Sequence, residues 1–208
     1  DDVIDVIREE ATEDILKMAG ADETAFEGYS VVKNVRTRAP WLFATWLGGL
    51  AASVLIGAFE AQLEARVALA AFIPIVLGMG GNVGTQTATI MVRGLATGRV
   101  SRDIGSRYFM RETGIGAMLG ILYGALLAGY SVVRYGGGGE TVQLALTVGL
   151  SILTSMTAAA TVGSATPLLF DRLNIDPAVA TGPVVTTTVD ILGILVYFLT
   201  AAAFLGGL

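Results

Sequence analysis

Long runs without charged residues alternate with short polar segments along this chain of 208 residues. Four runs contain no Asp, Glu, Lys or Arg, namely residues 39–59, 67–92, 113–133 and 141–170. A fifth run, residues 177–208, holds one charged residue, Asp190. A bilayer requires about 20 apolar residues for each crossing helix, and every run is long enough. The pattern predicts an all-α membrane protein with five transmembrane helices.

The first 20 residues follow a different pattern, in which apolar positions recur with a helical period. Val3, Ile7, Ala11, Ile15 and Met18 fall on one side of a helix, and acidic residues cover the other side. Gly20 is a suitable end for this helix. We predict an amphipathic, cytosolic helix within a connecting region of residues 1–38, followed by a transmembrane domain of residues 39–208.

The acidic side of this predicted helix has two interpretations. Its members are Asp1, Asp2, Asp5, Glu9, Glu10, Glu13 and Asp14. A solvated helix face is the simpler interpretation. The alternative is a surface that responds to divalent cations, because cations relieve the repulsion among carboxylates and hard ions take oxygen ligands. No EF-hand spacing is present, so the pattern does not indicate a single calcium cage.

Basic residues gather in alternate connections between the predicted spans. Lys33, Arg36 and Arg38 precede the first span, five arginines lie between positions 93 and 111, and Arg172 follows the fourth span. The other connections hold only Arg66 and Arg134. The positive-inside rule therefore places the N-terminus in the cytoplasm and the C-terminus outside. We expect a multi-pass protein of the inner (plasma) membrane, in contact with lipid and without a nucleic-acid partner.

Asp190 is the strongest candidate for chemistry in the chain. A charge at the bilayer centre costs about 2.5–3.5 kcal/mol on insertion scales, so an intramembrane acid is a functional-site hypothesis by default. The structural alternative is an ion pair with an intramembrane Lys or Arg, which no other span offers. Helical spacing puts further residues on the same face of the fifth span: Pro183, Thr186 or Thr187, Gly193 and Tyr197. We expect Gly182 and Pro183 to weaken the helix before the acid.

The second predicted span carries a matching polar stripe. Asn82, Gln86, Thr89 and Arg93 are spaced as positions i, i+4, i+7 and i+11 of one helix face. We expect Pro74 and the glycines from Gly78 onward to interrupt this helix. Irregular backbone at membrane depth occurs only where it faces protein or a water-filled cavity. Packing between helices explains the glycines alone, whereas the stripe and the interruption together favour the wall of a conduction path.

The available side chains select the kind of ligand. The chain has no histidine and no cysteine, and no lysine follows Lys33. Zinc and copper prefer imidazole and thiolate, whereas carboxylates, amides and hydroxyls suit Mg²⁺, Ca²⁺ or Mn²⁺.

A two-fold dimer would place two copies of Asp190 across its axis, with room for a hydrated dication. An intramembrane hydrolase would need a second aspartate or a Ser–His or Ser–Lys pair, so we expect no enzyme. A proton-coupled carrier stays open as an alternative.

Three segments resemble the MgtE magnesium channel family. They are PWLFATWLGGL at 40–50, FIPIVLGMGGNVGTQTATIMVRGLATG at 72–98 and DPAVATGPVVTTTVDILGILVYF at 176–198. The leader DDVIDVIREEATEDI is similar to the plug helix of that family. The resemblance implies a homodimeric channel selective for Mg²⁺, with its pore between the second and fifth helices of the two subunits.

The resemblance also assigns residues to roles. It implies Asp190 as the central site for hydrated Mg²⁺, with the Thr186 carbonyl, Asn82 and Gly78 at neighbouring pore positions. Gln86, Thr89, Gly182, Pro183, Thr187 and Gly193 are expected to line the pore. Asp2, Asp5, Glu10, Glu13 and Asp14 match plug-helix positions that bind regulatory Mg²⁺ together with acids of cytosolic domains.

Two departures from the family pattern qualify these expectations. An acidic N-terminal domain and paired CBS domains, expected in the full-length protein, do not appear in this sequence, so we expect conduction without normal closure by Mg²⁺. Gly182 stands where some relatives are expected to have an amide. Mn²⁺, Ca²⁺ and Co²⁺ are alternative ions, and the alternative mechanism is a divalent-cation carrier coupled to protons or sodium.

Overall fold

The computed structural model describes residues 2–21, 31–101, 104–180 and 182–205, and the side chains of Asp2 and Asp5 lie outside that description. Its helices, with 3₁₀ segments labelled η, are α1 (Asp2–Met18), α2 (Val31–Gly57), α3 (Glu60–Ala65), η2 (Val67–Ala71), α4 (Ile73–Ala96), α5 (Gly105–Tyr135), α6 (Gly139–Arg172), η3 (Pro177–Ala180) and α7 (Pro183–Leu205). The described residues form no strand.

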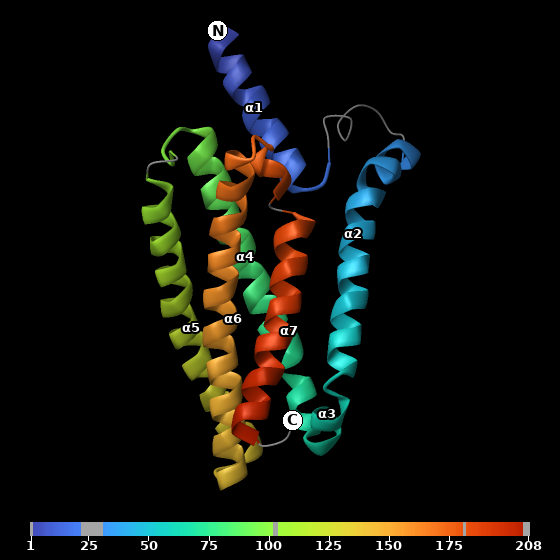
Figure 1. Cartoon of the computed structure of the whole chain (residues 1–208), viewed down its shortest axis with the longest axis vertical. Helices are drawn as coiled ribbons and strands as arrows, with labels where there is room; N and C mark the ends of the chain where they lie inside the picture. The colour runs from blue at the N-terminus through green and yellow to red at the C-terminus, as the bar shows by residue number, and fades with distance from the viewer. Residues whose placement is uncertain (1, 22–30, 102–103, 181, 206–208) are drawn as a thin grey trace.

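Five helical segments are long and apolar enough to cross a membrane, which confirms the predicted spans. They are Val31–Gly57, Val67–Ala96, Gly105–Tyr135, Gly139–Arg172 and Pro183–Leu205. The helices run side by side, with α1 at one end of the bundle and the end of α7 at the other (Figure 1). The connection between α4 and α5 lies at the same end as α1, so Arg93 in the last turn of α4 and Arg107 near the start of α5 belong to the end of the bundle that carries the acidic helix.

Helix α6 is the centre of the bundle and packs against α4, α5 and α7. Its side chains Val148, Ile152 and Met156 are almost completely buried. In contrast, α2 contains no buried residue and packs mainly against α7, at the edge of the bundle (Figure 1). The helices around α6 therefore form the closely packed part of the chain, and α2 flanks it.

Small residues allow α5 and α6 to approach closely. Gly116, Gly120 and Gly124 are spaced four residues apart, so they lie on one face of α5, and all three are buried. A β-carbon built on Gly120 would lie 2.8 Å from the Cα atom of Leu153 in α6, closer than real contacts allow. Close approach of this kind provides the van der Waals contact that holds helices together in lipid.

The expected interruption at the glycines is wrong, because α4 is continuous from Ile73 to Ala96. The span Val67–Ala96 does change before Pro74, where the 3₁₀ segment η2 ends at Ala71 and the α-helix begins at Ile73. Pro74 occupies its first turn, where the missing N–H has no partner in any helix. The glycines of α4 remain helical, since a membrane helix must satisfy its backbone hydrogen bonds internally. Pro183 likewise begins α7 and does not lie within it.

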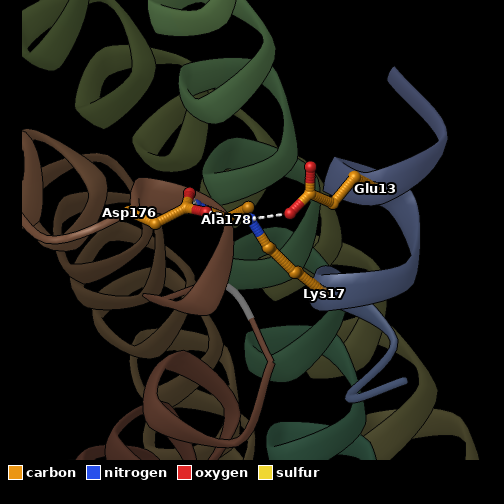
Figure 2. Close-up of polar contacts among 4 residues, drawn as sticks. All are labelled: Glu13, Lys17, Asp176 and Ala178. Atoms are coloured by element: carbon orange, nitrogen blue, oxygen red, sulfur yellow. Dashed lines mark hydrogen bonds and ion pairs between the residues drawn. The ribbon is translucent and has the colours of Figure 1, made fainter. Parts of the chain in front are cut away.

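Helix α1 ends as predicted, and its last turn contacts the connection between α6 and α7. Gly20 has a φ of +67°, the left-handed conformation that commonly ends a helix. Lys17 Nζ lies 2.6 Å from Asp176 Oδ2 and 2.7 Å from Glu13 Oε1 (Figure 2). Asp176 Oδ1 also accepts a hydrogen bond of 2.9 Å from the backbone N–H of Ala178. We call the contact of Glu13, Lys17 and Asp176 the α1 latch.

The protonation equilibria of the α1 latch follow from this geometry. Hydrogen bonds to Asp176 and Glu13 raise the pKa of Lys17 above its usual value. Partial burial works to raise the pKa of Asp176, but hydrogen bonds from Lys17 and Ala178 outweigh it and hold that pKa below the ordinary range. Partial burial and the nearby charge of Asp176 raise the pKa of Asp14. The latch is therefore strongest where Lys17 and Asp176 are both charged.

The close contact between the α5 glycines and α6 predicts that glycine-to-alanine substitution has opposite effects on stability at two positions of α5. Gly120→Ala should lower the free energy of unfolding by about 1–3 kcal/mol, because its β-carbon would overlap the backbone of α6. Gly129→Ala should leave stability unchanged or raise it by about 0.5–1 kcal/mol, since no atom lies within 4 Å of that β-carbon and alanine favours the helix. Unfolding in detergent measures both, and equal destabilisation would contradict the close contact.

The α1 latch predicts that Lys17→Ala releases α1, whereas Lys17→Arg retains it. The side chains of Lys17 and Asp176 are 32% and 37% exposed, so the pair contributes about 1 kcal/mol or less, a factor of about five in population. The chain has no cysteine, so spin labels at Glu9→Cys and Ile175→Cys report the distance within one chain when labelled chains are diluted with an excess of unlabelled chain. That distance should broaden in Lys17→Ala, and an unchanged distribution would contradict the latch.

The distance between the labels at positions 9 and 175 should change both at low pH and at high pH. The lowered pKa of Asp176 gives a contribution that is present above its ordinary pKa of about 3.9 and disappears as the pH falls through the lowered value. The raised pKa of Lys17 gives a contribution that is present below about 10.4 and disappears at still higher pH. Between these limits the distance should stay constant.

Candidate functional site

Asp190 lies where α7 packs against α4. The preceding residue, Val189, is buried against two glycines of α4, its methyl carbons lying 3.3 Å and 3.0 Å from the β-carbon positions of Gly80 and Gly84. Successive residues of a helix are about 100° apart, so this packing turns Asp190 toward the edge of the contact. There its Oδ1 lies 3.9 Å from the β-carbon position of Gly81.

The carboxylate of Asp190 is only partly buried. In the part of the chain that the structure describes, it has no ion pair and no side-chain hydrogen bond. The described residues therefore offer no support for the alternative of a structural ion pair. Gly81 was not among the residues predicted for the site, although a β-carbon there would be in van der Waals contact with the carboxylate.

The predicted polar stripe of α4 lies on a face that the rest of the chain leaves open. Gly78, Asn82 and Gln86 are exposed, Thr89 is partly buried, and Arg93 is exposed at the end of the helix. No atom lies within 4 Å of the β-carbon position of Gly78. The stripe and Asp190 therefore border one uncovered surface, which we call the α4–α7 face.

The start of α7 borders a separate hollow near the end of α1. A cavity of about 330 Å³ is lined by Met18, Ala19, Gly20, Arg38, Trp41, Leu42, Thr45, Gly182, Pro183 and Thr186. Six water molecules occupy about 180 Å³ at about 30 Å³ each, so the cavity is large enough for a hydrated ion. The backbone oxygen of Met18 lies 3.3 Å from the β-carbon position of Gly182, so α1 ends beside this segment.

Thr186 lies one turn before Asp190 and is fixed within the helix. Its hydroxyl donates a hydrogen bond of 3.2 Å to the Gly182 carbonyl. Because α7 is continuous here, the Thr186 carbonyl accepts the ordinary helical hydrogen bond, which leaves its second lone pair for another donor or a cation.

Two predicted pore residues do not reach the α4–α7 face. Gly193 is buried inside the chain, with its β-carbon position 3.2 Å from Ser155 Oγ of α6. Thr187 contacts Gly48 of α2. The prediction was based on helical spacing along α7, and it could not tell which sides of α7 are covered by α6 and α2.

The predicted regulatory acids lie on α1. Glu10 and Glu13 are exposed and Asp14 is partly buried, while the side chains of Asp2 and Asp5 lie outside the described residues. Among the acids that are described, no three converge into a group that could hold a metal ion. Glu13 is engaged by Lys17 in the α1 latch.

The chemistry of the α4–α7 face follows from its donors. One carboxylate, one or two side-chain amides and helical hydroxyls provide oxygen ligands of the kind preferred by hard cations. A single carboxylate without a basic neighbour suits an ion that keeps most of its water, since Mg²⁺ is usually bound through one or two carboxylates.

Comparison with known proteins agrees with this chemistry. Residues 73–200 match the sequence model of the MgtE family, which is described as a divalent cation transporter. The chain is 37% identical over 203 residues to the magnesium transporter MgtE of Thermus thermophilus, covering 97% of this chain and 44% of that protein. It is 35% identical over 209 residues to the magnesium transporter MgtE of Bacillus subtilis, covering 100% of this chain and 45% of that protein.

The chain therefore spans less than half the length of these relatives. The matched region begins at the start of α4 and ends within the last two turns of α7, so it contains both helices of the α4–α7 face. The family model matches more than half of the chain, and the structure has five helices that are long and apolar enough to span a membrane. This chain therefore belongs to the MgtE family.

Proposed function

We propose that this chain forms the membrane domain of a Mg²⁺ channel, in which hydrated Mg²⁺ passes along the α4–α7 face. The observation that carries the proposal is the position of Asp190, a carboxylate without an ion-pair partner among the described residues, beside an uncovered polar face. Membership of a family described as a divalent cation transporter, and the name of both relatives, favour Mg²⁺ as the ion.

A homodimer completes the proposed path. One chain supplies one carboxylate, and an uncovered face with a charged residue needs a partner within a membrane. A two-fold axis along the α4–α7 face would pair two copies of Asp190, giving two negative charges for one dication. Closed two-fold dimers are the commonest assembly of identical chains. Asn82, Gln86, Gly78 and the Thr186 carbonyl would then border the same path.

Retained water explains how such a site can bind and release the ion. Conduction requires binding that is favourable enough for entry and weak enough for departure. An inner shell of water keeps the carboxylates and the ion apart, which reduces their attraction. We therefore propose recognition of the hydrated ion as the basis of selectivity.

A carrier coupled to protons or sodium is the alternative to a channel. Carriers of this kind typically place their sites at discontinuous helices near the bilayer midplane. Both α4 and α7 are continuous through the candidate site, which favours the channel. The basic connections lie at the α1 end, so we propose that this end faces the cytoplasm of the inner membrane.

Asp190→Asn should reduce Mg²⁺ uptake into liposomes at least tenfold, because the variant removes the only charge at the proposed ion site. Each factor of ten corresponds to about 1.4 kcal/mol of lost stabilisation. Glu140→Gln is the matched control, since it neutralises an exposed acid at the start of α6. Size-exclusion chromatography must show that both variants assemble as the parent chain does, and undiminished uptake by Asp190→Asn would end the pore assignment.

The acids of α1 belong to a different helix from the two that form the α4–α7 face, and they predict a different outcome. Neutralising Asp2, Asp5, Glu10, Glu13 and Asp14 together should leave uptake through this 208-residue chain within about twofold of the parent, because the site at Asp190 is unchanged and the contact of Lys17 with Asp176 remains. Liposome flux measures this result. A tenfold loss would mean that α1 belongs to the permeation path.

A further inference from the structure

A basic hollow opens at the start of α5, away from the α4–α7 face. Its volume is about 300 Å³, and it is lined by Ile104, Arg107, Tyr108 and Arg111. Both arginines are exposed, and in the residues that the structure describes neither guanidinium has a hydrogen-bond or ion-pair partner. Among the described residues, two cations without a partner therefore border one hollow.

The position of these arginines on α5 is unfavourable without an anion. They are four residues apart, so their like charges are neighbours on one helix face and repel each other. They also lie in the first two turns of a helix, where the partial positive charge of the backbone disfavours cations, and the first turn holds no acidic residue. The adjacent carboxylate of Glu112 is buried. It is four residues from both Tyr108, which lines the hollow, and Gly116, which packs on α6, and it is not among the residues that line the hollow.

An apolar row continues from the hollow along the same side of α5. Its members are Ile115, Met118, Leu122 and Leu126, which lie four, seven, eleven and fifteen residues after Arg111. Their side chains are exposed by 39%, 73%, 53% and 60%, respectively. The glycines that pack on α6 occupy a different side of the helix. Helix α5 also lies at the edge of the bundle opposite α2 (Figure 1). A pair of cations at the end of a long exposed apolar row matches a charged headgroup followed by an acyl chain.

We propose that this hollow binds the phosphate of an anionic membrane phospholipid, with one acyl chain along the row from Ile115 to Leu126. Guanidinium groups bind phosphate oxygens in pairs, and the Tyr108 hydroxyl is a further donor at the same rim. Basic pockets at the cytoplasmic ends of membrane helices recognise such headgroups. The apolar row assigns the hollow to a lipid, since free phosphate would need only the arginines.

Lipid binding to the purified protein tests the proposal. Native mass spectrometry in neutral detergent should show that Arg107→Gln/Arg111→Gln binds dioleoylphosphatidylglycerol at least tenfold more weakly than the parent, because charge-assisted hydrogen bonds are lost. The control Arg36→Gln/Arg38→Gln removes two exposed arginines of α2 at the same end of the bundle and should bind as the parent does. Dioleoylphosphatidylcholine should bind all three proteins equally.

Two further arms separate the lipid from other partners. Arg107→Lys/Arg111→Lys keeps both charges but loses the paired guanidinium hydrogen bonds, so its binding should lie between that of the parent and that of the glutamine variant. Inorganic phosphate at millimolar concentration should not displace the lipid. Equal binding by the parent and the glutamine variant would overturn the proposal, and so would complete displacement of the lipid by phosphate. Disulfide cross-linking between chains through Met118→Cys would also overturn it, because it would assign the apolar row to a protein interface.

Discussion

A carboxylate among apolar helices, without a basic partner in the described structure, is the constraint on which the rest of this protein depends. Asp190 is the only charged residue of α7, and a charge at the bilayer centre costs about 2.5–3.5 kcal/mol on insertion scales. Val189 packs into the glycines of α4 and thereby turns Asp190 to the edge of the α4–α7 contact. The carboxylate can then meet water or a cation on the uncovered face, which lowers the cost of keeping it ionised.

The remaining helices hold this edge in place. Helix α6 packs against α4 and α7 on their covered sides and against the glycine face of α5, so the two helices of the α4–α7 face rest on a closely packed support. Helix α1 is attached at one end through Lys17 and Asp176, beside the cavity where α7 begins. The arrangement links α1 to the mouth of the proposed path through a contact that contributes about 1 kcal/mol or less.

Much of this fold could be predicted from the sequence, because membrane crossing imposes a strong and local signal. Charge-free runs gave the five spans, and the period of apolar residues with Gly20 gave α1 and its end. The acid of α7 and the stripe of α4 were likewise evident from charge and spacing. The prediction failed at the glycines of α4, which remain helical; the span changes only before Pro74, where η2 ends and α4 begins.

The parts that could not be predicted depend on contacts between distant residues. Lys17 and Asp176 are 159 positions apart, and nothing near either residue indicates the other. Spacing along α7 grouped Gly193 and Thr187 with Asp190, but α6 covers one and α2 contacts the other. Gly116, Gly120 and Gly124 had a visible spacing of four residues, yet only the structure identifies α6 as the helix they contact.

The distance between copies of one labelled position tests most directly whether the α4–α7 face lies at the two-fold axis. The chain has no cysteine, so Asn82→Cys and Met118→Cys each carry one spin label per chain. The account predicts a shorter distance between two labels at position 82 on α4 than between two labels at position 118 on the outer side of α5. A shorter distance at position 118, or no dipolar coupling at position 82, would contradict a path between paired Asp190 side chains.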